Sequence, residues 1–231
     1  MDHQKHQMMN LYITPSKDKT CHVKYRHRNV NVIDWSSMNC NFLNWVPQNQ
    51  HHWTPFDACH KFLLRIDEIE EIKTDYKHTI KSINWAMCGK TVKYFIPIAG
   101  KYKITNYDGN TISGDSRILY NTKNPITRYH LYYGSHTITT IERLDYSEGP
   151  KVLIIGDSMA IPMVMILATA CSKLTYIDNR EHRDLSRYNI HDYDKYFAIM
   201  VNSISKSTND TMNYWFMYDT ISYFANQLDE T

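Results

Sequence analysis

The chain has 231 residues, of which 42% are hydrophobic and 22% are charged, and its formal net charge is +2. These values are ordinary for a globular protein of one large or two small domains with a proper buried core. The charge is too small to indicate nucleic acid as a partner, so we expect none.

The cysteines, histidines and apolar runs limit the classes further. Five cysteines are widely scattered without a Cys-x-x-Cys pair, which argues against a disulfide framework and a zinc site. There are twelve histidines, and ligand spacing with carboxylates is lacking at His3, His6, His22, His27, His51, His60 and His78. We expect no metal and no cofactor. The first ten residues are polar, and the longest apolar run, 161–170, is too short to span a bilayer. We therefore expect no signal peptide and no membrane span: the chain is cytoplasmic, is carried out in an assembly such as a virion, or has lost its leader.

The first seventy residues predict a polar lead-in, a strand and a helix. Residues 1–28 are polar and basic without periodicity, which is typical of an irregular arm. Alternating apolar residues predict a short strand over 29–35. Thr54 is a good N-cap and Pro55 suits the first helical position, so we expect a helix over 55–73. Its apolar residues have helical spacing: Phe62, Leu63, Ile66, Ile69 and Ile72.

The middle of the chain, about 90–144, predicts a β-rich insertion. Apolar residues alternate over 92–96, 102–104, 117–119, 129–133 and 137–141. Glycines at positions 100, 109 and 114 lie between the first three of these runs and indicate turns there. Asp108-Gly109 is a candidate hairpin turn.

The last third alternates strands with helices. We expect strands over 152–155, 174–177 and 196–201, and helices over 160–171 and 214–228. This alternation indicates an α/β fold with a doubly wound parallel sheet. The predicted organisation is an arm over 1–28 and a single α/β domain over 29–231, into which the β-rich segment is inserted.

Two short motifs carry the candidate chemistry. The run Lys151 to Ser158 is an aliphatic strand that stops at Gly-Asp-Ser, which places Ser158 on a strand-to-helix turn beside a helix N-terminus. A second cluster, Gln50-His51-His52-Trp53-Thr54-Pro55, lies about a hundred residues earlier. Ser158 is thus a candidate nucleophile, although a plain helix cap explains it as well. Asp157 is better explained as a structural residue that binds local backbone amides.

Together with Asp178-Asn179-Arg180, these motifs resemble the SGNH hydrolase superfamily, specifically its DHHW branch, which includes alginate O-acetyltransferases. The resemblance runs from about residue 30 to 205. It implies a flavodoxin-like three-layer fold, with Ser158 as nucleophile, His52 as its base and Arg180 as a positive charge near the site. Without the resemblance, His52 would be a residue that packs on Trp53, and Arg180 would pair with Asp178 or Glu181.

The chain departs from the family at Gln50, which stands where the family has the aspartate that orients the histidine. The Gln50 carbonyl can hold the imidazole tautomer but cannot stabilise an imidazolium, and in serine proteases the equivalent change costs about 10⁴ in turnover. Asp57 and Asp34 are alternative orienters.

Two functions follow from the resemblance. One is a serine esterase or O-acetyltransferase that acts on acyl groups of a polysaccharide or cell-wall glycan through an acyl-serine. The other is a catalytically degenerate relative with a glycan-binding or structural role, for example in a virion or a cell-envelope complex. In either case, we expect a fold that is trimmed at one edge or completed by another chain, because only about fifty residues precede the His52 cluster.

Overall fold

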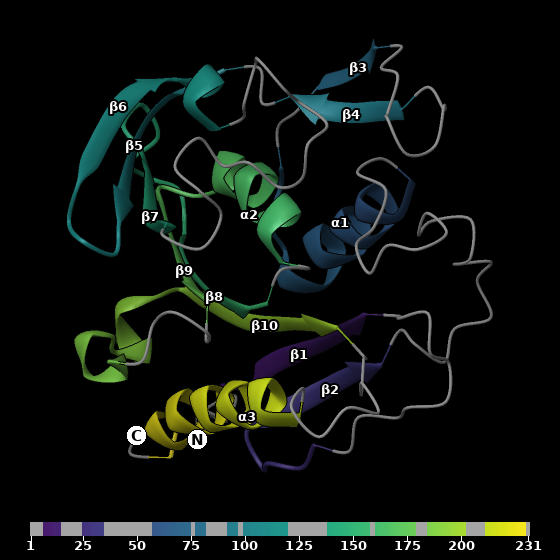
Figure 1. Cartoon of the computed structure of the whole chain (residues 1–231), viewed down its shortest axis with the longest axis vertical. Helices are drawn as coiled ribbons and strands as arrows, with labels where there is room; N and C mark the ends of the chain where they lie inside the picture. The colour runs from purple at the N-terminus through teal and green to yellow at the C-terminus, as the bar shows by residue number, and fades with distance from the viewer. Residues whose placement is uncertain are drawn as a thin grey trace, which may run out of the picture.

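The computed structural model describes residues 7–14, 25–34, 57–74, 77–81, 92–96, 99–119, 138–157, 160–178, 184–201 and 211–229. Within these ranges it contains an eight-stranded mixed sheet, a separate two-stranded sheet and helices on both faces of the larger sheet (Figure 1). The predicted α/β class is confirmed.

Five strands of the large sheet run parallel: β1 (Met9–Thr14), β2 (Val30–Asp34), β8 (Lys151–Gly156), β9 (Lys173–Asp178) and β10 (Lys195–Val201). They lie in the order β2-β1-β10-β8-β9, so β10, the last strand of the described residues, returns to the middle of this parallel group. Three antiparallel strands extend the sheet beyond β9: β7 (Ile138–Arg143), β5 (Lys101–Asn106) and β6 (Thr111–Asp115).

Two hydrophobic cores lie on opposite faces of this sheet. On one face, α1 (Asp57–Glu70) and α2 (Ile161–Leu167) pack on the sheet, and Leu63 and Ile66 share a core with Ile154. On the other face, α3 (Thr211–Gln227) buries Ile221 and Phe224 with Ile155. Consecutive residues of β8 therefore enter different cores, which explains its unbroken aliphatic sequence.

The remaining elements are short. β3 (Lys77–Lys81) and β4 (Val92–Ile96) form the two-stranded sheet. The 3₁₀ helices are η2 (Ser116–Leu119), η3 (Ala168–Ala170), η4 (Leu185–Arg187) and η5 (Ile190–Asp192). No helix of the described residues is long and apolar enough to cross a membrane.

Two predictions of local structure were wrong. The irregular arm predicted over 1–28 contains β1, whose Met9, Leu11 and Ile13 are fully buried between β2 and β10. The strand predicted over 117–119 is η2, because the Asp115 carboxylate accepts the Arg117 backbone N–H (3.0 Å) and turns the chain out of β6. The predicted run over 129–133 lies outside the described residues, and the division of the chain at residue 28 stays a prediction.

The hairpin predicted at Asp108-Gly109 is confirmed. It joins β5 to β6, and Gly109 adopts a φ of 84°, in the left-handed region that favours glycine. The Asn106 side chain accepts the Asn110 backbone N–H at 2.8 Å and closes the turn.

Candidate functional site

The turn after β8 requires a glycine. A Cβ atom on Gly156 would lie 2.4 Å from the Cβ of Ala160 and 3.3 Å from the carbonyl oxygen of Ile199 on β10. The chain therefore folds back tightly between the strand end and α2, whose first turn contains Pro162. This close approach explains why the aliphatic run ends in glycine.

Hydrogen bonds from both neighbouring strands hold the backbone of this turn. The Tyr176 hydroxyl, from β9, donates to the carbonyl of Asp157 at 3.0 Å. On the other side, the Asp157 backbone N–H donates to the carbonyl of Ile199 on β10 at 3.4 Å. Ala160 closes the turn by donating its N–H to the Asp157 carbonyl at 3.0 Å. The backbone that leads into the Ser158 position is therefore fixed as far as Asp157.

Acidic residues lie at the ends of both central strands. Asp178, the last residue of β9, is paired in register with Gly156 and is fully buried. Asp157 is half-buried, and both residues interact with their surroundings. The structural role of the Asp157 side chain stays a prediction.

The orientation of α1 follows from contacts at its end. Glu70, the last residue of α1, accepts hydrogen bonds from Tyr12 and from Asn10 in the first half of β1. The next residue, Glu71, lies 3.7 Å from Lys195, which begins β10. Helix α1 therefore ends at the amino ends of the parallel strands. Its fourteen residues span about 21 Å, so its first turn lies toward their carboxyl ends, where Gly156 and Asp157 lie (Figure 1).

The Glu70 contact also perturbs ionisation. Burial raises the pKa of the Glu70 carboxyl above its usual value, while the hydrogen bonds from Tyr12 and Asn10 and the charge of Lys195 oppose the rise. Burial and the facing Glu70 carboxyl likewise raise the pKa of Tyr12. This buried pair anchors the end of α1 on β1.

The predicted site residues Ser158, His52, Gln50 and Arg180 lie outside the described residues. Ser158 follows the end of β8 and Arg180 follows the end of β9, and these two strand ends lie side by side because Gly156 pairs with Asp178. The alternative orienter Asp34 is the last residue of β2. Because β1 and β10 lie between β2 and β8, the strands β2 and β8 are about 14 Å apart. The other alternative, Asp57, begins α1.

Tyr176, which holds the turn, was not among the residues predicted from the sequence. Its only signal is its position two residues before Asp178 on a predicted strand, and the pattern of that strand marks it as core. Among the described residues, no three His, Cys, Asp or Glu side chains gather closely enough to hold a metal ion.

The fold resembles that of solved structures. PatB1 from Bacillus cereus matches with a TM-score of 0.61 and 17% sequence identity, over 85% of this chain and 83% of that one. PatB1 with a sulfonyl adduct gives a TM-score of 0.60 at the same identity, over 86% of this chain and 83% of that one. A DHHW family protein from Eubacterium siraeum matches with a TM-score of 0.58 and 13% identity, over 97% of this chain and 83% of that one.

At these identities the likeness establishes a related fold. No family model matches the sequence, and no curated protein matches it.

Proposed function

We propose that the protein is a serine acyltransferase or esterase of the SGNH type, with a doubly wound fold and its site at the carboxyl ends of β8 and β9. In this proposal Ser158 is the nucleophile and His52 is its base. The substrate is an acylated glycan of a polysaccharide or cell wall.

The orientation of α1 is the observation that carries the proposal. His52 precedes the first residue of α1 by five positions, and that end of α1 lies toward the carboxyl ends of the strands. Ser158 follows the fixed turn at Gly156 and Asp157 on the same edge of the sheet. Chain connectivity therefore supports a meeting of the two residues, although about a hundred positions separate them.

The likeness in fold supports the same chemistry. Among the matched structures are a member of the DHHW family and PatB1 carrying a sulfonyl adduct. A sulfonyl electrophile forms an adduct with an activated nucleophile, which is the property proposed for Ser158.

In the proposed reaction, His52 takes the proton of the Ser158 hydroxyl while the oxygen attacks the acyl carbonyl. The tetrahedral intermediate collapses as the ester oxygen leaves with the proton from His52, and an acyl-serine remains. Water or a second hydroxyl then loses its proton to His52 and attacks the acyl-serine. The bond to the Ser158 oxygen breaks as His52 returns the proton to it, and the acyl group leaves as the free acid or the new ester. The Gln50 carbonyl would accept the other imidazole N–H, and Arg180 would place positive charge near the developing oxyanion.

One observation favours a second function. Gln50 cannot supply the negative charge that stabilises the imidazolium, and this favours a non-catalytic relative that binds glycan or forms part of a virion or envelope complex. The two functions differ in whether Ser158 is activated.

Hydrolysis of p-nitrophenyl acetate distinguishes the two functions. We expect slow turnover by the wild type, and loss of this turnover in Ser158→Ala and in His52→Ala. Two control variants, Ser113→Ala and His191→Ala, change exposed residues of β6 and η5 and should retain the wild-type rate. Equal rates in the wild type and all four variants would exclude acyl chemistry at Ser158.

Replacing Gln50 tests its proposed role as orienter. Gln50→Asp restores the family's charge, and the gain in turnover could approach about 10³–10⁴ where the shorter side chain reaches the imidazole. If Gln50→Asp has no effect while Asp57→Asn or Asp34→Asn abolishes turnover, another carboxylate orients His52.

A further inference from the structure

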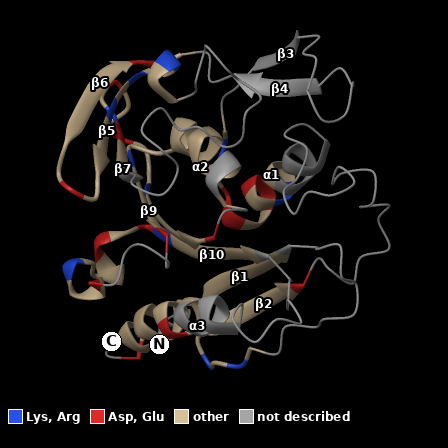
Figure 2. Ribbon diagram, in the orientation of Figure 1, with Lys and Arg blue, Asp and Glu red and all other residues tan. Residues whose placement is uncertain are grey.

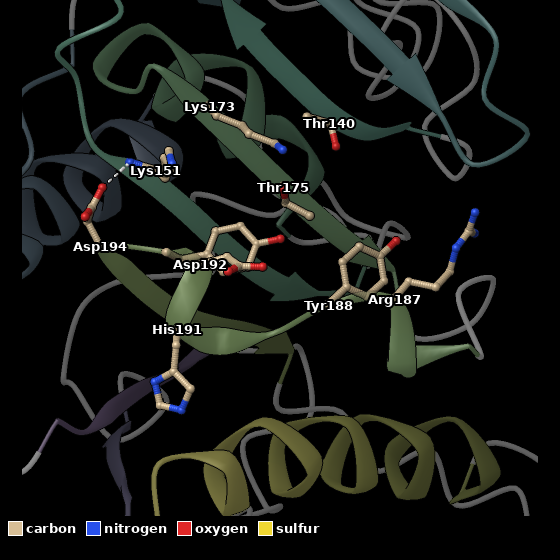
Figure 3. Close-up of a pocket in the computed structure, with 10 residues that line it drawn as sticks. Thr140, Lys151, Lys173, Thr175, Arg187, Tyr188, His191, Asp192 and Asp194 are labelled. Atoms are coloured by element: carbon tan, nitrogen blue, oxygen red, sulfur yellow. Dashed lines mark hydrogen bonds between the residues drawn. The ribbon is translucent and has the colours of Figure 1, made fainter. Parts of the chain in front are cut away.

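A polar pocket of about 550 Å³ lies away from the proposed acyl site. It is formed by β7, β8, β9 and the segment that contains η4 and η5 (Figure 3). Lys151 and Lys173, the first residues of β8 and β9, line it, whereas the proposed acyl site follows the last residues of these strands. Six residues of strand span about 17 Å between the two places.

The pocket occupies the part of the sheet face that α3 leaves uncovered. On this face, β9 presents Ile177 to the core beneath α3, followed by Thr175 and Lys173 toward its amino end. Thr140 of β7 is paired in register with Thr175, so hydroxyl groups from two strands lie side by side. Toward the amino end of β9, the apolar surface beneath α3 is therefore followed by hydroxyl groups and a lysine, which line the bottom of the pocket.

Cations exceed anions in the lining. Lys173 forms no ion pair with any residue that the structure describes, and its side chain points toward Thr140 (Figure 3). Arg187 lies with its guanidinium 5.0 Å from the ring centre of Tyr107. Of the two lining carboxylates, that of Asp194 accepts the Lys151 backbone N–H at 2.8 Å, and Asp192 is exposed. Because Lys151 also lines the pocket, three cations face these two acids.

Two tyrosines complete the wall with aromatic rings and phenol groups. The Tyr188 phenol is protonated at neutral pH, as tyrosine ordinarily is, and can donate a hydrogen bond; burial raises its pKa further, to about 12. Tyr193 forms a side-chain hydrogen bond with Thr175, and burial also raises its pKa. Both residues are partly exposed at the pocket.

We propose that this pocket binds a sugar that carries an anionic group. Lys173 would hold the anionic group, Thr140 and the tyrosine phenols would hydrogen-bond the sugar hydroxyls, and the ring of Tyr188 would pack against the sugar's apolar face. An apolar ligand would leave these polar groups unpaired, and a neutral sugar would leave the Lys173 ammonium without a counter-charge. The inference is independent of the proposed acyl chemistry.

Titration by ¹⁵N NMR tests the proposal with four probes: tetragalacturonate, glucose 6-phosphate, neutral maltotetraose and inorganic phosphate. We expect the backbone signals of residues 173–175 and 187–193 to shift with one or both anionic sugars, and those of Gly156 and Asp157 to stay. The tighter of the two sugars identifies the anionic group as carboxylate or phosphate.

Three variants locate the contact. Lys173→Gln should weaken binding of the anionic sugar about tenfold or more, as expected for a charge-assisted hydrogen bond. Tyr188→Leu, which removes the ring, should weaken it further than Tyr188→Phe, which removes only the phenol. Lys101→Gln makes the same change of charge at an exposed position of β5 and should leave the affinity unchanged. Thermal unfolding checks that each variant remains folded.

The proposal would be overturned if maltotetraose bound as tightly as the anionic sugars, or if inorganic phosphate bound as tightly as glucose 6-phosphate. It would also be overturned if Lys173→Gln left the affinity for the anionic sugar unchanged, or if neither anionic sugar shifted the signals at concentrations up to about 10 mM.

Discussion

The parallel and antiparallel parts of the large sheet differ in how many faces of their strands are buried. Strands β8 and β10 carry lysine only at their first residue, and helices bury both of their faces. In β5, buried Tyr102 and Ile104 alternate with Lys101, Lys103 and Thr105 on the other face. Figure 2 shows this contrast, with β10 and β1 largely tan and charged segments along β5 and β7.

The contrast separates two roles of the sheet. Among the parallel strands, β8 and β10 are buried on both faces and support the turn after β8. The antiparallel part keeps one polar face, and that face contributes to the pocket around Lys173. Stability should therefore depend on both faces of the parallel strands but on only one face of the antiparallel strands.

The largest expected effect comes from truncation of side chains on each face. Ile154→Ala and Ile155→Ala should each lower the free energy of unfolding by about 2–5 kcal/mol, because both residues are fully buried, in different cores. On β5, Ile104→Ala should have a similar cost. Lys103→Ala should cost less than about 1 kcal/mol, because its ion pair with Glu142 (3.3 Å) is partly exposed. Urea denaturation measures all four, and equal losses for Lys103→Ala and Ile104→Ala would contradict the contrast.

Effects of intermediate size are expected when the glycines of two turns, one in each part of the sheet, are replaced by alanine. Gly156→Ala should cost about 1–3 kcal/mol, because the new Cβ would overlap Ala160 and approach the Ile199 carbonyl. Gly109→Ala in the β5–β6 turn should cost about 1 kcal/mol, since its new Cβ has open space around it and only its positive φ is strained. A larger loss for Gly109→Ala in the same denaturation experiment would show that the turn after β8 is not tightly packed.

The smallest expected effect concerns pH. Since burial raises the folded-state pKa of Glu70, its stabilising contribution is complete below the unfolded pKa and is lost as pH rises through the folded pKa. Glu70→Gln can still accept a hydrogen bond from Tyr12 but does not ionise. The melting temperature of this variant should therefore rise relative to wild type between pH 4 and 7.

Glu71→Gln is the matched control, because the Glu71 side chain is 84% exposed. It should show no such trend. A relative melting temperature for Glu70→Gln that falls between pH 4 and 7 would show that ionised Glu70 stabilises the fold.

Much of this fold could be predicted from periodicity. The aliphatic run at 152–155 and the mainly apolar runs at 174–177 and 196–201 predicted strands that the structure confirms as β8, β9 and β10. The helical spacing of Leu63 and Ile66 predicted α1, which is confirmed over Asp57–Glu70. These signals are strong because two buried faces leave little freedom in residue choice.

The failures have a physical reason. The strand β1 lies in a polar segment, and its burial depends on pairing with β10, nearly two hundred residues later. The pocket around Lys173 depends equally on long-range packing, because the segment of η4 and η5 meets β7 only in the folded chain. The proposed acyl site was predicted from motifs, and Ser158, His52, Gln50 and Arg180 remain predictions.

Labelling with a fluorophosphonate probe tests the central claim most directly. The probe forms a covalent bond with an activated serine, and peptide mass spectrometry locates that bond. We predict labelling on Ser158, absent in Ser158→Ala and strongly reduced in His52→Ala, while Ser113→Ala is labelled like the wild type. A folded wild-type protein that stays unlabelled, or is labelled on another serine, would contradict Ser158 as the activated nucleophile.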